Sequence, residues 1–102
     1  APVFTFSGNA PDLVTNGVIP DNLGVGSMNI HLPYYSQTIN ITNLASPQGS
    51  PLFISFHGGM SPTALRAGEN MTLTSSGAPE MFFSGDGGTP LFTVRASIVN
   101  RG

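Results

Sequence analysis

The chain has 102 residues and a mass of 10.6 kDa, which is the size of one domain. Charged residues make up only 8% of it, against about 25% in an ordinary domain, and the formal net charge is −2. Three basic residues cannot form the basic patch that nucleic acids require, so we expect no nucleic-acid partner. The absence of cysteine excludes disulfides, zinc–thiolate sites, iron–sulfur clusters and thiol nucleophiles.

The low charge also bears on what surrounds the protein. A soluble monomer normally has many charged residues of both signs on its surface. A surface this neutral favours contact with other protein, and we expect oligomerisation. No apolar run approaches the roughly 18 residues of a membrane span, and no basic segment precedes an apolar one as in a signal peptide. We therefore expect no membrane partner.

The chain alternates between short strand patterns and turns. Strand patterns lie at residues 3–6, 28–32, 36–42, 52–56, 70–74, 80–83 and 91–99. In the longer ones, apolar and polar residues alternate with the two-residue period of half-buried strands. In the last of these, Val94 is expected to face inward and Arg95 outward. Residues 61–67 could form one helical turn, with Pro62 at its first position.

Turn residues separate these patterns at short intervals, at 46–49, 58–59, 67–68, 76–79 and 85–88. The run from Ser84 to Gly88 is typical of a tight hairpin turn, since Asp-Gly favours positive φ angles. Many short strands with frequent turns predict an all-β fold, a small antiparallel β-sandwich that is jelly-roll-like and has no substantial helix.

The first 27 residues differ from the rest because Gly, Pro and Asn interrupt every regular pattern in them. Two interpretations stay open. Residues 1–27 are either a loop-rich beginning with one edge strand, or an extended N-terminal arm that lies on a neighbouring subunit and adds little to the fold. Residues 28–102 would then form the β-sandwich domain.

The sequence offers no convincing catalytic or metal-binding pattern. His31 and His57 are the only histidines, and their spacing matches no metal motif. No Gly-x-Ser-x-Gly nucleophile motif is present, and the five acidic residues lie beside turns, where solvated carboxylates are common. We predict that the chain is not an enzyme and has no catalytic, cofactor-binding or metal-binding residues.

The second half has a recognisable order of strands and turns. It runs from Pro51 to Phe56, through Leu65-Arg-Ala-Gly68-Glu69, a strand at 71–74 and another at 79–83, to a Gly-rich turn and a closing strand at 91–97. Over residues 36–99 this order resembles small β-sandwich modules of tailed-bacteriophage virion proteins, including capsid decoration (cement) proteins. No functional residue carries over, because the shared pattern fixes turns only.

The resemblance implies a structural virion protein, most simply a capsid decoration protein that binds and stabilises the phage head shell. Its partners would be the major capsid protein and identical copies of itself, as a homotrimer. Its place would be the capsid surface of the virion, after synthesis in the host cytoplasm.

Two other functions remain open from the residues alone. One is a carbohydrate-binding or adhesive β-sandwich module, for which Tyr34 and Tyr35 would form the stacking platform. The other is a subunit of a surface filament, in which the arm would be a donated strand. For any of these functions, the candidate partner-binding residues are Val3, Phe4, Phe6, Tyr34 and Tyr35.

Overall fold

A computed structural model describes residues 3–24, 26–32, 36–46, 49–56, 60–74 and 80–98, with the backbone alone at 36 and 37. Its described residues form strands and no helix, so none of them belongs to a helix that could span a membrane. The eight strands are β1 (Val3–Asn9), β2 (Met28–His31), β3 (Ser36–Asn43), β4 (Leu52–Ser55), β5 (Thr63–Leu65), β6 (Asn70–Thr74), β7 (Glu80–Gly85) and β8 (Leu91–Ile98).

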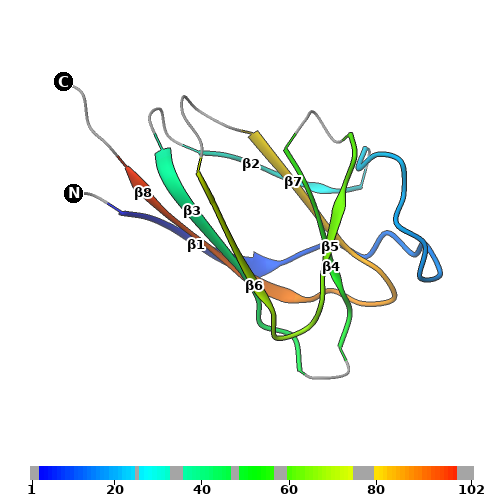
Figure 1. The fold of residues 1–102 in the computed structure, drawn as a ribbon. Helices are drawn as coiled ribbons and strands as arrows, with labels where there is room; N and C mark the ends of the chain where they lie inside the picture. Colours follow the sequence, from blue (N-terminus) through cyan, green and yellow to red (C-terminus); the bar gives the residue numbers. More distant parts are fainter. Residues whose placement is uncertain are drawn as a thin grey trace.

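The strands make two sheets, each of four strands, with the orders β1-β8-β3-β6 and β2-β7-β4-β5 (Figure 1). All pairs of neighbouring strands are antiparallel. The chain passes repeatedly from one sheet to the other, since β1, β3, β6 and β8 belong to the first sheet and the rest to the second. The predicted fold class, a small antiparallel β-sandwich, is confirmed.

The core lies between the two sheets and follows from the two-residue alternation. In β3 the side chains of Ile39 and Ile41 are fully buried, and in β8 those of Phe92 and Val94 are. Phe92 stacks on Phe83 of the other sheet, with ring centroids 4.4 Å apart. Such a ring pair adds roughly 1 kcal/mol beyond the burial of its area. The predicted facing of the closing strand is correct, because Val94 is buried and Arg95 is exposed.

The helical turn considered for residues 61–67 is wrong. Residues 63–65 form β5, in which Leu65 lies opposite Leu52 and Thr63 opposite Ile54. Leu65 is buried in the core by this pairing. A single helical turn has too few hydrogen bonds to compete with a strand that adds to an existing sheet.

The Gly-rich turn at 84–88 is not a hairpin either. It joins β7 to β8, and these strands belong to different sheets. Gly87 has the positive φ angle expected, at 77°. A Cβ atom at Gly85 would lie 2.4 Å from both the Gly88 carbonyl oxygen and the Pro90 Cδ, so this sharp change of sheet requires glycine there.

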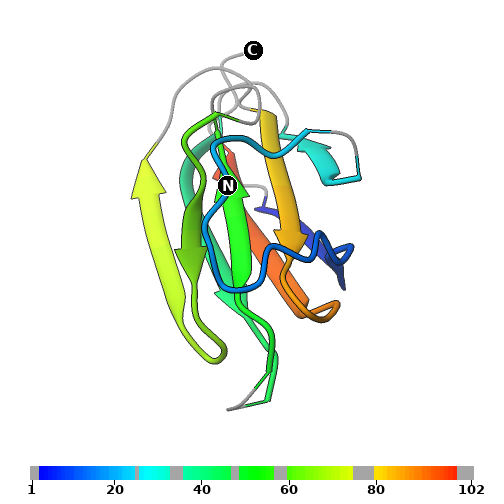
Figure 2. The same cartoon turned by 90° about the vertical axis from the view of Figure 1, so that its right-hand side faces the viewer.

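The second sheet is buried on both of its faces at β4. All four residues of this strand are buried, although Phe53 and Ser55 point away from the core that holds Leu52 and Ile54. Residues 10–24 run in front of this outer face (Figure 2). Within this segment Ala10 is buried in the core between the sheets, and Leu23 is buried outside that core cluster. The segment therefore forms a third, irregular layer over the second sheet.

This layer bears on the two interpretations of residues 1–27. β1 pairs with β8 along its whole length, and Ser61 donates its N–H to the Asp21 carbonyl oxygen at 3.2 Å. The described residues 3–24 supply an edge strand of the first sheet and a layer over the second. The division of the chain at residue 28 stays a prediction. Contact with a neighbouring subunit stays a prediction.

The register of β8 gives a direct test of the core. Val94→Asp should lower the free energy of unfolding by roughly 3 kcal/mol or more, because it places an unpaired charge among apolar side chains. The matched control, Arg95→Ser on the exposed face, should change it by less than about 0.5 kcal/mol. Urea denaturation of both variants measures the difference, and a larger loss at Arg95 would show that the register is off by one residue.

Candidate functional site

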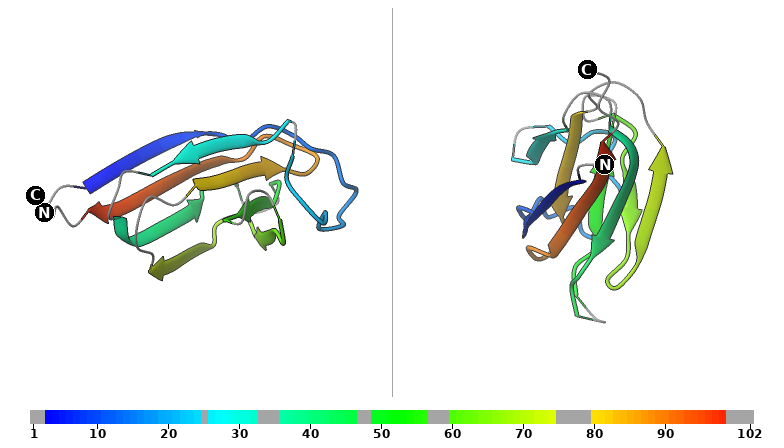
Figure 3. Two further views of the ribbon diagram at one scale, coloured as in Figure 1. Left: turned by 90° about the horizontal axis from the view of Figure 1, so that it is seen from above. Right: turned by 90° about the vertical axis from the view of Figure 1, so that its left-hand side faces the viewer.

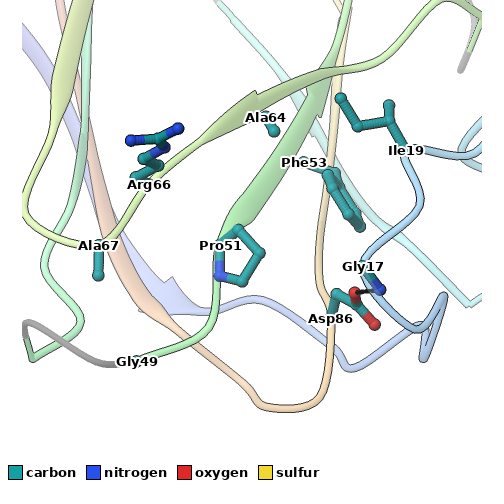
Figure 4. Close-up of a pocket in the computed structure, with 9 residues that line it drawn as sticks. All are labelled: Gly17, Ile19, Gly49, Pro51, Phe53, Ala64, Arg66, Ala67 and Asp86. Atoms are coloured by element: carbon teal, nitrogen blue, oxygen red, sulfur yellow. Dashed lines mark hydrogen bonds between the residues drawn. The ribbon is translucent and has the colours of Figure 1, made fainter.

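A groove of about 490 Å³ lies on the outer side of the second sheet, within the size range of small-ligand sites. Figure 4 shows the side chains that surround it. Its described lining residues come from the third layer, from β4 and β5 and the loops beside them, and from the turn after β7: Gly17, Ile19, Gly49, Pro51, Phe53, Ala64, Arg66, Ala67 and Asp86.

One wall of the groove is a loop held by a single carboxylate. The Oδ1 atom of Asp86 accepts the backbone N–H groups of Thr15 at 2.5 Å and Asn16 at 3.1 Å, and its Oδ2 atom accepts that of Gly17 at 2.6 Å. Successive N–H groups that converge in this way form an anion-binding concavity. Here the anion is a side chain of the same protein, some 70 residues along the chain.

A second carboxylate makes the reciprocal contact. Asp12 Oδ1 accepts the N–H of Gly87, in the turn that carries Asp86, at 2.9 Å, and that of Val14 at 3.0 Å. The backbones also pair, since Leu13 donates to the Gly85 carbonyl oxygen and Gly85 donates to that of Pro11. The loop and the turn are therefore bound to each other by hydrogen bonds in both directions. We call this contact the carboxylate clasp.

The clasp stabilises an unusual backbone. Val14 and Asn16 both have a φ angle of 55°, and Gly17 has one of 85°. The left-handed region is strained for a β-branched residue such as Val14, at a cost on the order of 1–3 kcal/mol. Hydrogen bonds to charged acceptors are stronger than neutral ones, which lets the clasp hold this conformation.

The same hydrogen bonds change the acidity of Asp86. The backbone N–H of Thr15, followed by that of Gly17, holds the pKa of this carboxyl below its ordinary value of 3.8. Both groups favour the charged form because they donate hydrogen bonds to it. Asp86 is therefore ionised at neutral pH and already engaged as an acceptor.

The floor and the opposite wall are mostly apolar. Phe53, only 2% exposed, lies beneath Gly17 and Ile19, and Pro51 continues the floor (Figure 4). On the other side Arg66 is the cation among the described lining residues, and its side chain is exposed. No hydroxyl, thiol or imidazole belongs to this described lining. The described lining therefore offers apolar contact, one guanidinium and the Asp86 carboxylate, which the clasp already engages.

The predicted partner-binding residues are not in this groove. Val3, Phe4 and Phe6 belong to β1 in the other sheet; Val3 is exposed, and both Phe side chains are half-buried against the core. Tyr34 and Tyr35 lie outside the described residues, as does His57. His31 is exposed at the end of β2, and the described ranges contain no cluster of three or more His, Cys, Asp or Glu side chains.

The large exposed apolar side chains are a further surface feature. Val18 is 67% exposed and Val14 60%, and Ile19 is also exposed in the same loop. Met60, which follows in the chain after β4, is exposed at 63% and bridges to Asn22 of the third layer. Contiguous exposed apolar surface often marks a contact site, so the loop at 14–19 is a candidate surface for contact with another molecule.

Sequence reasoning missed the clasp. It placed Asp12 and Asp86 among solvated acids beside turns, although both carboxylates accept two or more backbone N–H groups. A local signal existed for Asp12 alone, since an Asp two residues before a backbone N–H often accepts from it. The partnership between residues 12–17 and 86 spans the whole fold and has no local signal.

Comparison with known proteins gives the fold and no more. No family model and no curated protein matches the chain. A cupin protein from Bacteroides fragilis superposes with a TM-score of 0.60 at 11% identity, covering 100% of this chain and 70% of that one. A de novo designed double-stranded beta-helix superposes with a TM-score of 0.52 at 11% identity, covering 94% and 97%. Such low identity shows the jelly-roll-like sandwich alone.

The clasp predicts a specific dependence of stability on pH. Because the pKa of Asp86 is lower in the folded than in the unfolded chain, its contribution is present above about pH 4 and is lost as the pH falls through the folded pKa. Asp86→Asn should therefore lower the melting temperature at pH 7. The difference in melting temperature between variant and wild type should become smaller as the pH falls below 4.

Asp21→Asn is the matched control, because Asp21 is exposed and contributes its backbone carbonyl oxygen rather than its carboxylate. This variant should have the melting temperature of wild type both at pH 7 and below pH 4. An Asp86→Asn variant as stable as wild type at pH 7 would show that the clasp does not hold the loop.

Proposed function

We propose that the chain is a structural virion protein, a capsid decoration protein that binds the phage head shell and stabilises it. The observation that carries the proposal is the exposed apolar loop at residues 14–19, held rigid by the carboxylate clasp on a small sandwich with few charges. The order of strands and turns over residues 36–99, which resembles that of phage decoration proteins, supports the same role.

The rigidity of the loop matters for binding. A flexible loop loses conformational entropy when it binds, at about 1–2 kcal/mol per ordered backbone residue. The clasp fixes residues 12–17 within the folded chain. The loop therefore loses this conformational entropy on folding and not on binding. Val14 and Val18 can then enter pockets of a partner surface with little further ordering.

The surface chemistry fits a protein as the partner, and in this role the partner is the major capsid protein. Interface centres are depleted in charged residues and enriched in apolar ones. Only 8% of this chain is charged, and the loop from 14 to 19 carries no charge at all. In this role the chain makes no chemical conversion, and the described groove lining supplies neither nucleophile nor free base.

An adhesive, carbohydrate-binding module is the second candidate, and the groove itself favours it. Its 490 Å³ could hold a small sugar, with Arg66 as a donor. Its floor is less favourable, because Phe53 is almost fully buried and presents little ring face for stacking. The two candidates use neighbouring but different residues, so variants can separate them.

The decoration role predicts loss of attachment when the apolar loop is charged. Val18→Asp should reduce binding to empty expanded phage heads that lack their decoration protein by about tenfold or more, because a carboxylate would be desolvated in the interface. Its melting temperature should stay within about 2 °C of wild type, since Val18 is exposed. Co-sedimentation with the heads measures attachment.

Thr72→Asp on the exposed face of β6 is the matched control and should bind as wild type does. Equal binding of Val18→Asp and wild type would refute the role of the loop. A glycan array on which wild type binds and Arg66→Ala does not would replace the decoration role with the adhesive one.

A further inference from the structure

The two sheets have four edge strands, and they are not alike. β5 has three residues, β2 four and β6 five, whereas β1 has seven. Soluble proteins block exposed edges with short strands, charged side chains, proline or bulges. β1 reads Val3-Phe-Thr-Phe-Ser-Gly-Asn9, without charge or proline, and its register with β8 is unbroken. It is the one long edge in the described sheets that has none of these protections.

The open side of β1 carries a regular row of backbone groups. Ala10, which continues the strand, donates its N–H to the Pro90 carbonyl oxygen at 3.0 Å. Backbone groups of successive residues point to alternate sides, so Phe4, Phe6 and Gly8 also face β8. The N–H and C=O groups of Val3, Thr5, Ser7 and Asn9 therefore point away from the sheet, and no described strand lies beyond β1 (Figure 3).

The side chains of β1 leave apolar surface beside this row. Phe4 and Phe6 pack against the core but remain half-buried, and the Phe6 ring lies 5.8 Å from that of Phe92. In a central strand the next strand would cover the rest of both rings. At this edge no described strand provides that cover, so part of both rings is accessible to a partner.

We propose that β1 pairs with β1 of a second copy of this chain, antiparallel and with a two-fold axis at Phe6. This register pairs the whole strand, placing Val3 opposite Asn9 and Thr5 opposite Ser7 of the second copy as hydrogen-bonded pairs. The two Phe6 side chains then lie opposite each other, on the same face as Phe4. A contact of this kind is self-complementary, because each copy supplies the same surface.

A second copy is the partner that the strand fits best. The strand carries no charge, so two copies meet without repulsion, and both bring an aromatic residue to the axis. Aromatic cross-strand pairs contribute about 0.2–1 kcal/mol each, in addition to the backbone hydrogen bonds. The inference does not depend on the decoration role, since it concerns how the chain meets itself. A two-fold contact also differs from the homotrimer that the phage resemblance implies.

Thr5→Pro tests the backbone pairing. It removes one outward N–H and puts a ring on the open edge, while the hydrogen bonds to β8 remain, so the fold should persist. We expect wild type to sediment with twice the 10.6 kDa mass of one chain. For Thr5→Pro the dissociation constant of the dimer should rise by about tenfold or more. Thr5→Val keeps the N–H and should dimerise as wild type does. Ser7→Lys, which adds edge charge without changing the backbone, should weaken the dimer as well.

Cysteine cross-linking tests the register, and the chain has no cysteine of its own to interfere. In hydrogen-bonded antiparallel pairs the Cα atoms are about 5.5 Å apart, a separation that a disulfide spans well. The double variant Thr5→Cys, Ser7→Cys should oxidise to a covalent dimer, whereas Thr5→Cys alone should not. A monomer or trimer in sedimentation, a Thr5→Pro variant as dimeric as wild type, or a dimer that resists this cross-link would each overturn the proposal.

Discussion

At β4 the second sheet is buried on both faces, and the arrangement of the chain follows from that constraint. Leu52 and Ile54 fill the core, while Phe53 on the same strand is buried on the opposite face. A sandwich of two sheets leaves its outer faces in water, where a ring this large would lose on the order of 2–3 kcal/mol of burial energy. Residues 10–24 supply the missing cover. This segment is irregular and contains Gly and Asn, so it can cover the sheet only if specific contacts hold it there.

The carboxylate clasp provides that attachment. Irregular backbone that lies against a protein surface needs partners for its N–H groups, because regular structure does not supply them. Asp86 and Asp12 accept five such groups between them, and all five belong to residues 14–17 and 87. Two of the chain's few acids are therefore used within the fold. The segment can be polar and irregular in sequence and still be a fixed layer.

Much of the fold could be predicted from the sequence, and the successes share one cause. Strands with one buried face alternate apolar and polar residues, as at Ile39 and Ile41 or at Phe92 and Val94. The two-residue period alone is sufficient to predict such strands. A strand was expected at 52–56 as well, but its outer face is also buried, since all four residues of β4 are. Nothing local distinguishes Phe53 on an outer face from a residue at the core. β5 was missed for a related reason, because three residues are too few to show a period.

The polar contacts between distant parts of the chain could not be predicted from the sequence. Asn43, fully buried at the end of β3, donates to the carbonyl oxygens of Ser50 and Leu65 and accepts the N–H of Ala45. It joins the first sheet to the second. In the sequence it is one Asn among many, at the end of a run in which Thr38, Asn40 and Thr42 lie on the opposite face of the strand. Its role exists only once the strands have been brought together.

The two surfaces proposed for contact lie on different parts of the sandwich, and their separation has a consequence. The exposed loop at 14–19 belongs to the layer over the second sheet, and the β1 edge belongs to the first. Neither surface covers the other within the chain, so a pair of copies joined at β1 would present two loops. On a repetitive shell, two linked loops bind with an effective local concentration that a single copy lacks, which can raise avidity by about 10²–10⁴ where the spacing matches. Modest apolar anchors such as Val14 and Val18 would then be sufficient for lasting attachment.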